Sequence, residues 1–76
     1  MGKITYTKQQ NALRYSTTQF IGGTATTGEV WESVDGLWNG WVITHSAKPN
    51  LKELGFTSKV SATAWVNRHL RAAGVR

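Results

Sequence analysis

The stretch that decides the fold runs from Ser33 to Val42 and reads SVDGLWNGWV. It contains two dipeptides, Asp35-Gly36 and Asn39-Gly40, that tolerate the positive backbone angles of a tight hairpin turn, although a hairpin needs one of them. A turn at Asn39-Gly40 would place Asp35 and Gly36 inside a strand, where both residue types are unfavourable. We therefore predict that the chain reverses at Asp35-Gly36.

This turn predicts how the two flanking strands, over residues 29–34 and 37–46, lie against each other. With a two-residue loop, Ser33 faces Trp38 and Trp31 faces Gly40, so that the Trp31 ring covers the bare glycine backbone. One face of the sheet then carries Trp31, Trp38, Gly40, Val42 and Thr44. The outward face carries Val30, Glu32, Val34, Leu37, Asn39, Trp41, Ile43 and His45.

The downstream sequence predicts a third strand and a helix. A turn over 47–50 leads to a short strand over 51–56, in which Gly55 indicates a bulge. A helix over about 58–73 begins at a Thr57 or Ser58 cap and ends before Gly74. Its apolar stripe, which is expected to pack on the sheet, comprises Ala62, Trp65, Val66, His69, Leu70 and Ala73.

These elements predict an α+β fold for the 76 residues, as one globular unit. Residues 29–76 form a three-stranded antiparallel sheet packed against one C-terminal helix. Residues 1–28 form a basic segment that adds a strand or a helix and ends in a Gly- and Thr-rich loop over 21–28. The apolar outward face is expected to be covered. Three covers are possible: a second copy of the chain, a different protein, or the apolar residues of the N-terminal segment, which are Ile4, Tyr6, Leu13, Tyr15 and Phe20.

The formal net charge of +5 indicates polyanionic partners. Three of the four acids, Glu29, Glu32 and Asp35, lie together between two segments that each carry a net positive charge. The sequence has no cysteine, and its two histidines lack a paired acid at ligand spacing, so we expect no metal and no cofactor. No paired carboxylates, nucleophile elbow or phosphate loop is present, so we expect a protein that is not an enzyme.

No segment resembles a signal peptide or an apolar membrane span, so we expect a cytoplasmic protein without membrane contact. The size and composition of the chain look like those of bacteriophage accessory proteins. If the protein is encoded by a phage, the expected location is the cytoplasm of the bacterial host cell.

The residues from Val30 to Leu70 resemble the three-stranded-sheet-plus-helix DNA-binding domains of tyrosine recombinases (the integrase arm-type domain) and of plant ethylene-response factors. The matching residues are Gly36, Trp38, Val42, Phe56, Ser58, Lys59, Ala62 and Trp65. Val60 departs from the pattern, because these domains usually have an acidic residue there. The resemblance implies that the sheet face opposite the helix enters the major groove of DNA. The outward face here lacks the several Arg or Lys residues that such domains usually show.

Two functional hypotheses follow. In the first, a small accessory or regulatory protein binds double-stranded DNA through the basic N-terminal arm, the sheet turns and the helix. Its candidate DNA-binding residues are Lys3, Lys8, Arg14, Asn39, Lys48, Lys52, Arg68 and Arg71. In the second, a phage-type interaction module docks Leu37, Trp41 and Ile43 on a host protein or on a second copy of itself. Trp41 has three possible roles: a stacking platform for a base, an interface residue, or a core residue under the N-terminal arm.

Overall fold

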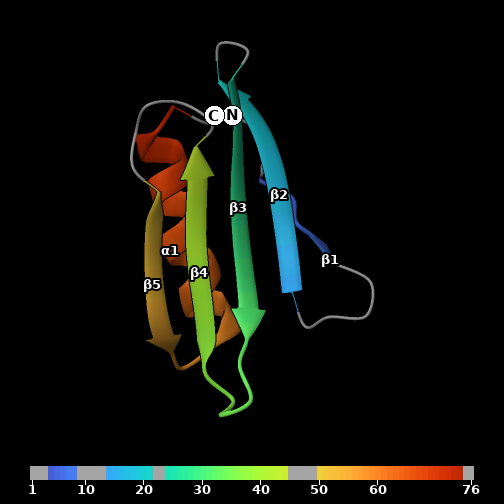
Figure 1. Ribbon diagram of the computed structural model, residues 1–76, viewed down its shortest axis with the longest axis vertical. Coiled ribbons are helices and arrows are strands. Elements are labelled where there is room, and N and C mark those ends of the chain that lie inside the picture. The colour runs from blue at the N-terminus through green and yellow to red at the C-terminus, as the bar shows by residue number, and fades with distance from the viewer. Residues whose placement is uncertain (1–3, 9–13, 22–23, 45–49, 75–76) are drawn as a thin grey trace.

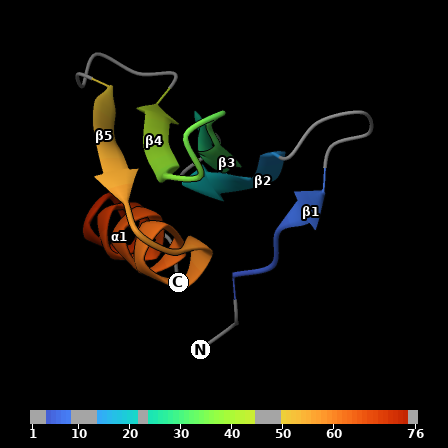
Figure 2. The same ribbon diagram turned by 90° about the horizontal axis from the view of Figure 1, so that it is seen from below.

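A computed structural model describes residues 4–8, 14–21, 24–44 and 50–74. Predictions for Lys3, Leu13, His45 and Lys48 lie outside the described residues. The elements are β1 (Thr7–Lys8), β2 (Arg14–Ile21), β3 (Thr24–Glu32), β4 (Trp38–Thr44), β5 (Leu51–Phe56) and α1 (Lys59–Ala72). The strands form one antiparallel sheet in chain order, and α1 lies across one of its faces (Figures 1 and 2).

The predicted α+β class, antiparallel sheet and C-terminal helix are confirmed, but the sheet has five strands instead of three. The predicted loop over 21–28 is wrong at Ile21 and over 24–28, because β2 extends to Ile21 and β3 begins at Thr24, which pairs with it. The threonines of this segment are β-branched and therefore suit a strand. Gly28, which suggested a loop, serves instead to let α1 approach the sheet.

The chain reverses where predicted, but the loop between β3 and β4 is one residue longer than expected. The Ser33 backbone N–H donates to the Leu37 carbonyl at 2.9 Å, so three residues separate the paired ends. The last of them, Gly36, has a φ of 82°, as is common in three-residue hairpin loops. The Asp35 carboxylate accepts from Ser33 Oγ at 2.5 Å and from the Leu37 N–H at 3.0 Å. These hydrogen bonds, that of Ser33 above all, lower the pKa of Asp35.

The longer loop exchanges the two faces of β3, because a shift of one residue turns every side chain of a strand over. Val30 lies opposite Gly40, and Trp31 lies opposite Asn39. Val30 therefore faces α1 and is fully buried, which corrects its predicted outward position. The predicted cover of Gly40 by Trp31 is also wrong, since Trp31 contacts Trp41 on the other face.

The core lies between the sheet and α1. Its buried residues are Ile4, Val30, Val42, Ala62, Val66 and Leu70. Two strand glycines allow a close approach: a Cβ atom on Gly28 would lie 2.7 Å from Val66 Cγ1, and one on Gly40 would lie 2.8 Å from Val66 Cγ2. Val66 thus packs into the space that these two glycines leave open.

The helix agrees with the sequence prediction. Ser58 caps it, since the Ser58 Oγ accepts a hydrogen bond from the Ser61 N–H at 3.1 Å. The predicted stripe faces the sheet: Ala62, Val66 and Leu70 are buried, and Trp65, His69 and Ala73 are partly buried. The bulge predicted near Gly55 is also present, because the pairing of β4 with β5 shifts there and Gly55 has a φ of 85°.

The N-terminal residues 4–8 pack on the helix side of the sheet. Ile4 joins the core, and the Tyr6 hydroxyl donates to Asn67 Oδ1 of α1 at 2.6 Å. Burial raises the pKa of Tyr6 to about 12, although the positive charge of Arg71 acts in the opposite direction. Phe20 is 73% exposed, so most of its surface does not pack on the sheet. The expected cover of the outward sheet face by N-terminal apolar residues is therefore wrong for the described residues, and the segment adds strands at the sheet edge instead.

Candidate functional site

The sheet face opposite α1, here named the open face, carries two tryptophans at its centre. The ring centroids of Trp31 and Trp41 lie 5.6 Å apart, and the rings meet edge to face at 69°. Both side chains are partly exposed. The Trp41 indole N–H donates to Glu29 Oε1 at 2.5 Å, which fixes the orientation of that ring. The two indoles thus form an aromatic surface of fixed orientation, and the described part of the chain leaves this surface accessible.

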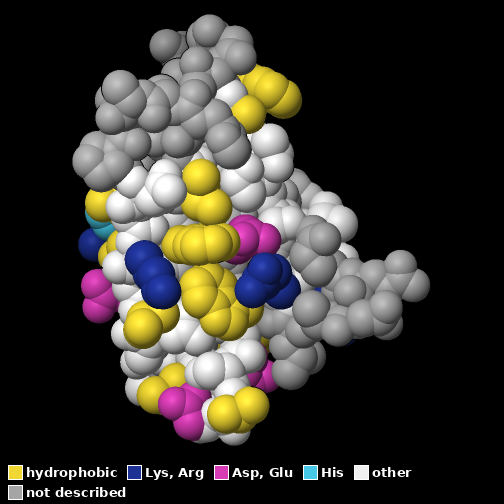
Figure 3. Space-filling model, viewed as in Figure 1, with side chains coloured by type: hydrophobic (Ala, Val, Ile, Leu, Met, Phe, Trp, Pro, Cys, Tyr) yellow, Lys and Arg dark blue, Asp and Glu magenta, His cyan; other side chains and the backbone are white. Residues whose placement is uncertain are grey.

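Basic side chains lie on both sides of the indoles. The Arg14 guanidinium carbon, on β2, lies 5.4 Å from the centroid of the Trp31 ring, which is within cation–π distance. On β5, Lys52 is exposed and lies opposite Trp41 in the sheet register. Figure 3 shows hydrophobic side chains at the middle of this face with a basic side chain to either side. At a strand spacing of about 4.8 Å, β2 and β5 lie about 14 Å apart.

The end of the open face near the hairpin between β3 and β4 is apolar and hollowed. Val34 is 110% exposed, Leu37 is 36% exposed and Leu54 is 57% exposed. A shallow hollow of about 450 Å³ is lined by Trp31, Ser33, Asp35, Leu37, Asn39, Lys52, Leu54 and Gly55. Trp31 and Lys52 therefore border both the central aromatic surface and this hollow.

The structure divides the candidate DNA-binding residues between two sides of the molecule. Arg14 and Lys52 come together on the open face. Arg68 and Arg71 are exposed on α1, which covers the opposite face. Lys8 is exposed on β1 and lies opposite Tyr15, which packs against the core on the helix side. Lys3 and Lys48 lie outside the described residues.

Asn39 has a structural role that the sequence did not predict. It is 6% exposed, its amide nitrogen donates to the Trp31 carbonyl at 3.4 Å, and its amide oxygen accepts from the Gly55 N–H at 3.2 Å. The Asn39 side chain thus holds β5 at the bulge, and its amide nitrogen and amide oxygen each have a hydrogen-bond partner within the fold. We therefore do not include Asn39 in the contact surface.

The candidate interface residues Leu37, Trp41 and Ile43 share the open face. Trp41 and Ile43 are partly exposed on β4, and Leu37 lies at the hairpin end of the face. Trp31 was missed, because the two-residue loop placed it in the core. The signal for the longer loop was Asp35, since an Asp side chain can accept from the backbone N–H two residues on, here that of Leu37.

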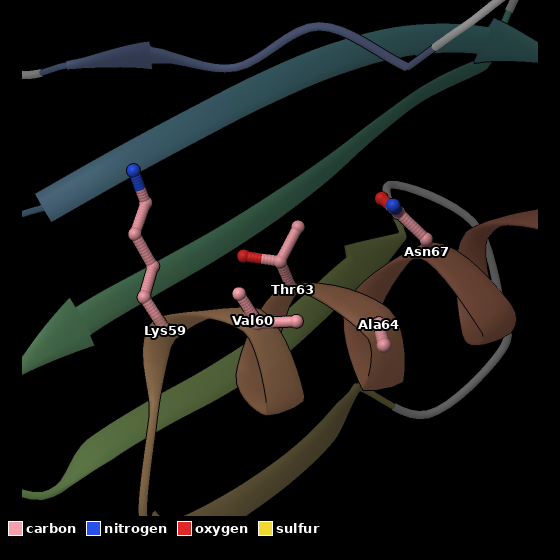
Figure 4. Close-up of a pocket in the computed structure, with 5 residues that line it drawn as sticks. All are labelled: Lys59, Val60, Thr63, Ala64 and Asn67. Atoms are coloured by element: carbon pink, nitrogen blue, oxygen red, sulfur yellow. The ribbon is translucent and has the colours of Figure 1, made fainter.

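A second hollow lies on the helix side, between α1 and the N-terminal segment. It has a volume of about 390 Å³, and its lining residues are Ile4, Thr5, Tyr6, Lys59, Thr63, Asn67 and Arg71. Figure 4 shows the adjoining part of this surface, where Lys59, Thr63 and Asn67 extend from α1 on the side of the strands. The Lys59 ammonium lies 3.4 Å from the Tyr15 ring centroid, and Asn67 bonds Tyr6. These polar groups therefore already have partners within the fold.

Two classes of site are absent from the described ranges. No group of three or more His, Asp or Glu residues there is arranged to hold a metal ion. No described helix has the length and apolar character that crossing a membrane requires. None of the protein families, curated proteins and solved structures compared with this chain matches it.

Proposed function

We propose that the protein is a small DNA-binding accessory protein whose contact surface is the open face and which catalyses no reaction. The observation that carries this proposal is the convergence of Arg14, Trp31, Trp41 and Lys52 on one accessible surface. Lysine and arginine side chains bind backbone phosphates, and indoles offer flat apolar surfaces to bases. Proteins that bind single-stranded nucleic acids combine both kinds of group.

The charge distribution supports the same proposal. The net charge of +5 attracts a polyanion at long range. Arg14 and Lys52 then provide the positive charges that bind its phosphates on the open face. Arg68 and Arg71 belong to α1, which lies on the other side of the sheet (Figure 2). They therefore contribute to the long-range field and do not contact the same nucleic-acid segment as Arg14 and Lys52. The resemblance to sheet-based DNA-binding domains agrees with the use of the face opposite the helix.

A second candidate function is favoured by the apolar end of the open face. The exposure of Val34, Leu37 and Leu54 there is typical of a surface that docks a protein. Together with Trp41 and Ile43, these side chains would contact a host protein or a second copy of the chain. Sedimentation over a range of concentrations tests the second-copy form, and association that Leu37→Ser and Leu54→Ser abolish would support it.

The experiment that tests DNA binding uses fluorescence anisotropy of a labelled oligonucleotide at low and high salt. Binding is expected to weaken steeply with salt, and substituting Arg14 or Lys52 by alanine should reduce the logarithmic salt slope by about 0.7 to 0.9 each. Arg68→Ala is the matched control, since it removes the same charge from the helix. Its effect should be smaller than that of Arg14→Ala. An absence of binding at low salt to both single-stranded and duplex DNA would overturn the proposal.

A further inference from the structure

We infer that the open face binds single-stranded nucleic acid, with unpaired bases stacked on Trp31 and Trp41, in preference to a duplex. The inference rests on the proposed function and concerns the class of nucleic acid that the surface accepts. It departs from the duplex that the sequence resemblance implies.

A sheet that reads duplex DNA needs long hydrogen-bond donors and acceptors that reach the base edges in a groove. The middle of the open face does not supply them. Between Arg14 and Lys52, the register of β2, β3 and β4 places the two indoles, the Glu29 carboxylate and small hydroxyl side chains such as Ser16. Asn39, which has a suitable amide, is buried and bonded within the fold.

The aromatic surface suits unpaired bases instead. In a duplex the base faces are covered by their neighbours, so an indole cannot stack on them unless the helix is opened. In a single strand each base can turn a face toward the protein, and stacking tolerates any base because every base has a flat π surface. Trp31 and Trp41 meet edge to face, so their ring planes are not parallel and bases can approach them from different directions.

The spacing of the charges fits one extended strand. A backbone that crosses the sheet from β2 to β5 would meet Arg14, Trp31, Trp41 and Lys52 in that order, over about 14 Å. The Arg14 guanidinium lies over the Trp31 ring, so a base at this end would stack on the guanidinium plane or displace it from the indole; guanidinium planes stack on bases as indoles do.

The Glu29 carboxylate gives a second reason for the preference. It lies beside Trp41 near the centre of the face, where it would repel the phosphates of a duplex that pressed into the sheet. A single strand can instead turn its bases toward this carboxylate and keep its phosphates beside Arg14 and Lys52. One carboxylate oxygen accepts from the Trp41 indole, and the carboxylate retains capacity to accept from a base amino group.

The test compares one labelled oligonucleotide as a single strand without internal pairing, as the same strand annealed to its complement, and as the matching RNA strand. Anisotropy gives the affinity, and quenching of tryptophan fluorescence reports stacking. We expect either single strand to bind at least about tenfold more tightly than the duplex. Trp31→Leu and Trp41→Leu should each weaken single-strand binding by about 5- to 150-fold and change duplex binding by less than about twofold. The RNA arm identifies which single strand is bound more tightly.

Two controls keep the result interpretable. Circular dichroism melting shows whether each variant folds, and Trp41→Phe, which keeps an aromatic ring, should retain more single-strand affinity than Trp41→Leu. Arg68→Ala should weaken single-strand and duplex binding by the same factor. Duplex binding as tight as single-strand binding, with no effect of the indole substitutions, would overturn the inference and leave the proposed function standing. If neither form binds at low salt, the proposed function itself fails.

Discussion

Substitution of Gly40 by alanine tests how closely α1 lies on the sheet. In an ordinary strand this change would stabilise the protein, since glycine in a strand interior costs about 0.5–1 kcal/mol relative to alanine. Here the new Cβ atom would lie 2.8 Å from Val66 Cγ2 and 3.5 Å from a ring carbon of Trp65. Carbon atoms pack best at about 3.5–4.0 Å, so the first contact is too short. Val66 is fully buried and β-branched, so its side chain cannot simply turn away.

The magnitude follows from these two opposing effects. Overpacking of a core by one carbon costs about 1–3 kcal/mol, and the removal of a strand glycine returns about 0.5–1 kcal/mol. Subtracting these ranges leaves a net loss of about 0–2.5 kcal/mol, and the 2.8 Å contact with the fully buried Val66 favours the upper part, about 1–2 kcal/mol. For a domain of this size that loss lowers the melting temperature by roughly 4–16 °C.

The assay is urea unfolding followed by circular dichroism for Gly40→Ala, Val66→Ala and the double variant. Because Val66→Ala removes the methyl group that the new Cβ would meet, the double variant should be more stable than the sum of the single losses by about 1 kcal/mol. Gly36→Asn is the control, since a Cβ atom added at Gly36 would have no other atom within 4 Å and asparagine tolerates a positive φ. Additive effects of Gly40→Ala and Val66→Ala would refute the close approach of α1.

Three further predictions follow from particular contacts. Ser58→Ala should lower the unfolding free energy by about 1 kcal/mol in urea titrations, because the Ser61 N–H loses its cap; an unchanged midpoint would contradict the cap. The pKa of Tyr6 is raised from 10.0 to about 12 in the folded protein, so its contribution to stability is complete below pH 10 and is lost as the pH rises toward 12. Wild type should therefore lose more stability over that range than Tyr6→Phe, and parallel pH profiles would count against this. Glu29→Gln should tighten duplex binding more than single-strand binding in anisotropy, because it removes the negative charge beside Trp41 that repels duplex phosphates; a gain for the duplex no larger than that for the single strand would contradict this role of Glu29.

Local chemistry made part of the fold predictable from the sequence. Asp35-Gly36 located the hairpin, and the strand over 51–56 agrees with β5. The helix expected over 58–73 agrees with α1 within one residue at each end, because Ser58 and Gly74 are strong local signals. These features depend on residues that are near one another in the chain.

What the sequence did not yield depends on contacts between distant residues or on fine loop geometry. In the sequence Gly28 favours a loop, and its place in a strand is explained only by the packing of Val66 and Leu70 of α1 against it. The register of β3 depends on one additional loop residue, which the hydrogen bonds of the Asp35 carboxylate select. That single residue moved Trp31 from the expected core to the open face.

In the candidate site, too, features set by the local sequence were predictable and features set by strand pairing were not. Trp41 and Ile43 were placed correctly on the face opposite the helix, because alternation along β4 suffices for that. Arg14 and Lys52 were chosen one by one as basic residues. Their position on either side of the indoles could not be predicted, because it requires the pairing of four strands.

A nuclear magnetic resonance titration of the protein with an unlabelled single-stranded oligonucleotide tests most directly whether the open face is the nucleic-acid contact surface. We expect chemical shifts to change most at the indole N–H groups of Trp31 and Trp41 and at the backbone amides of Arg14 and Lys52. Shift changes centred on Arg68 and Arg71 of α1, with the two indole signals unmoved, would contradict this.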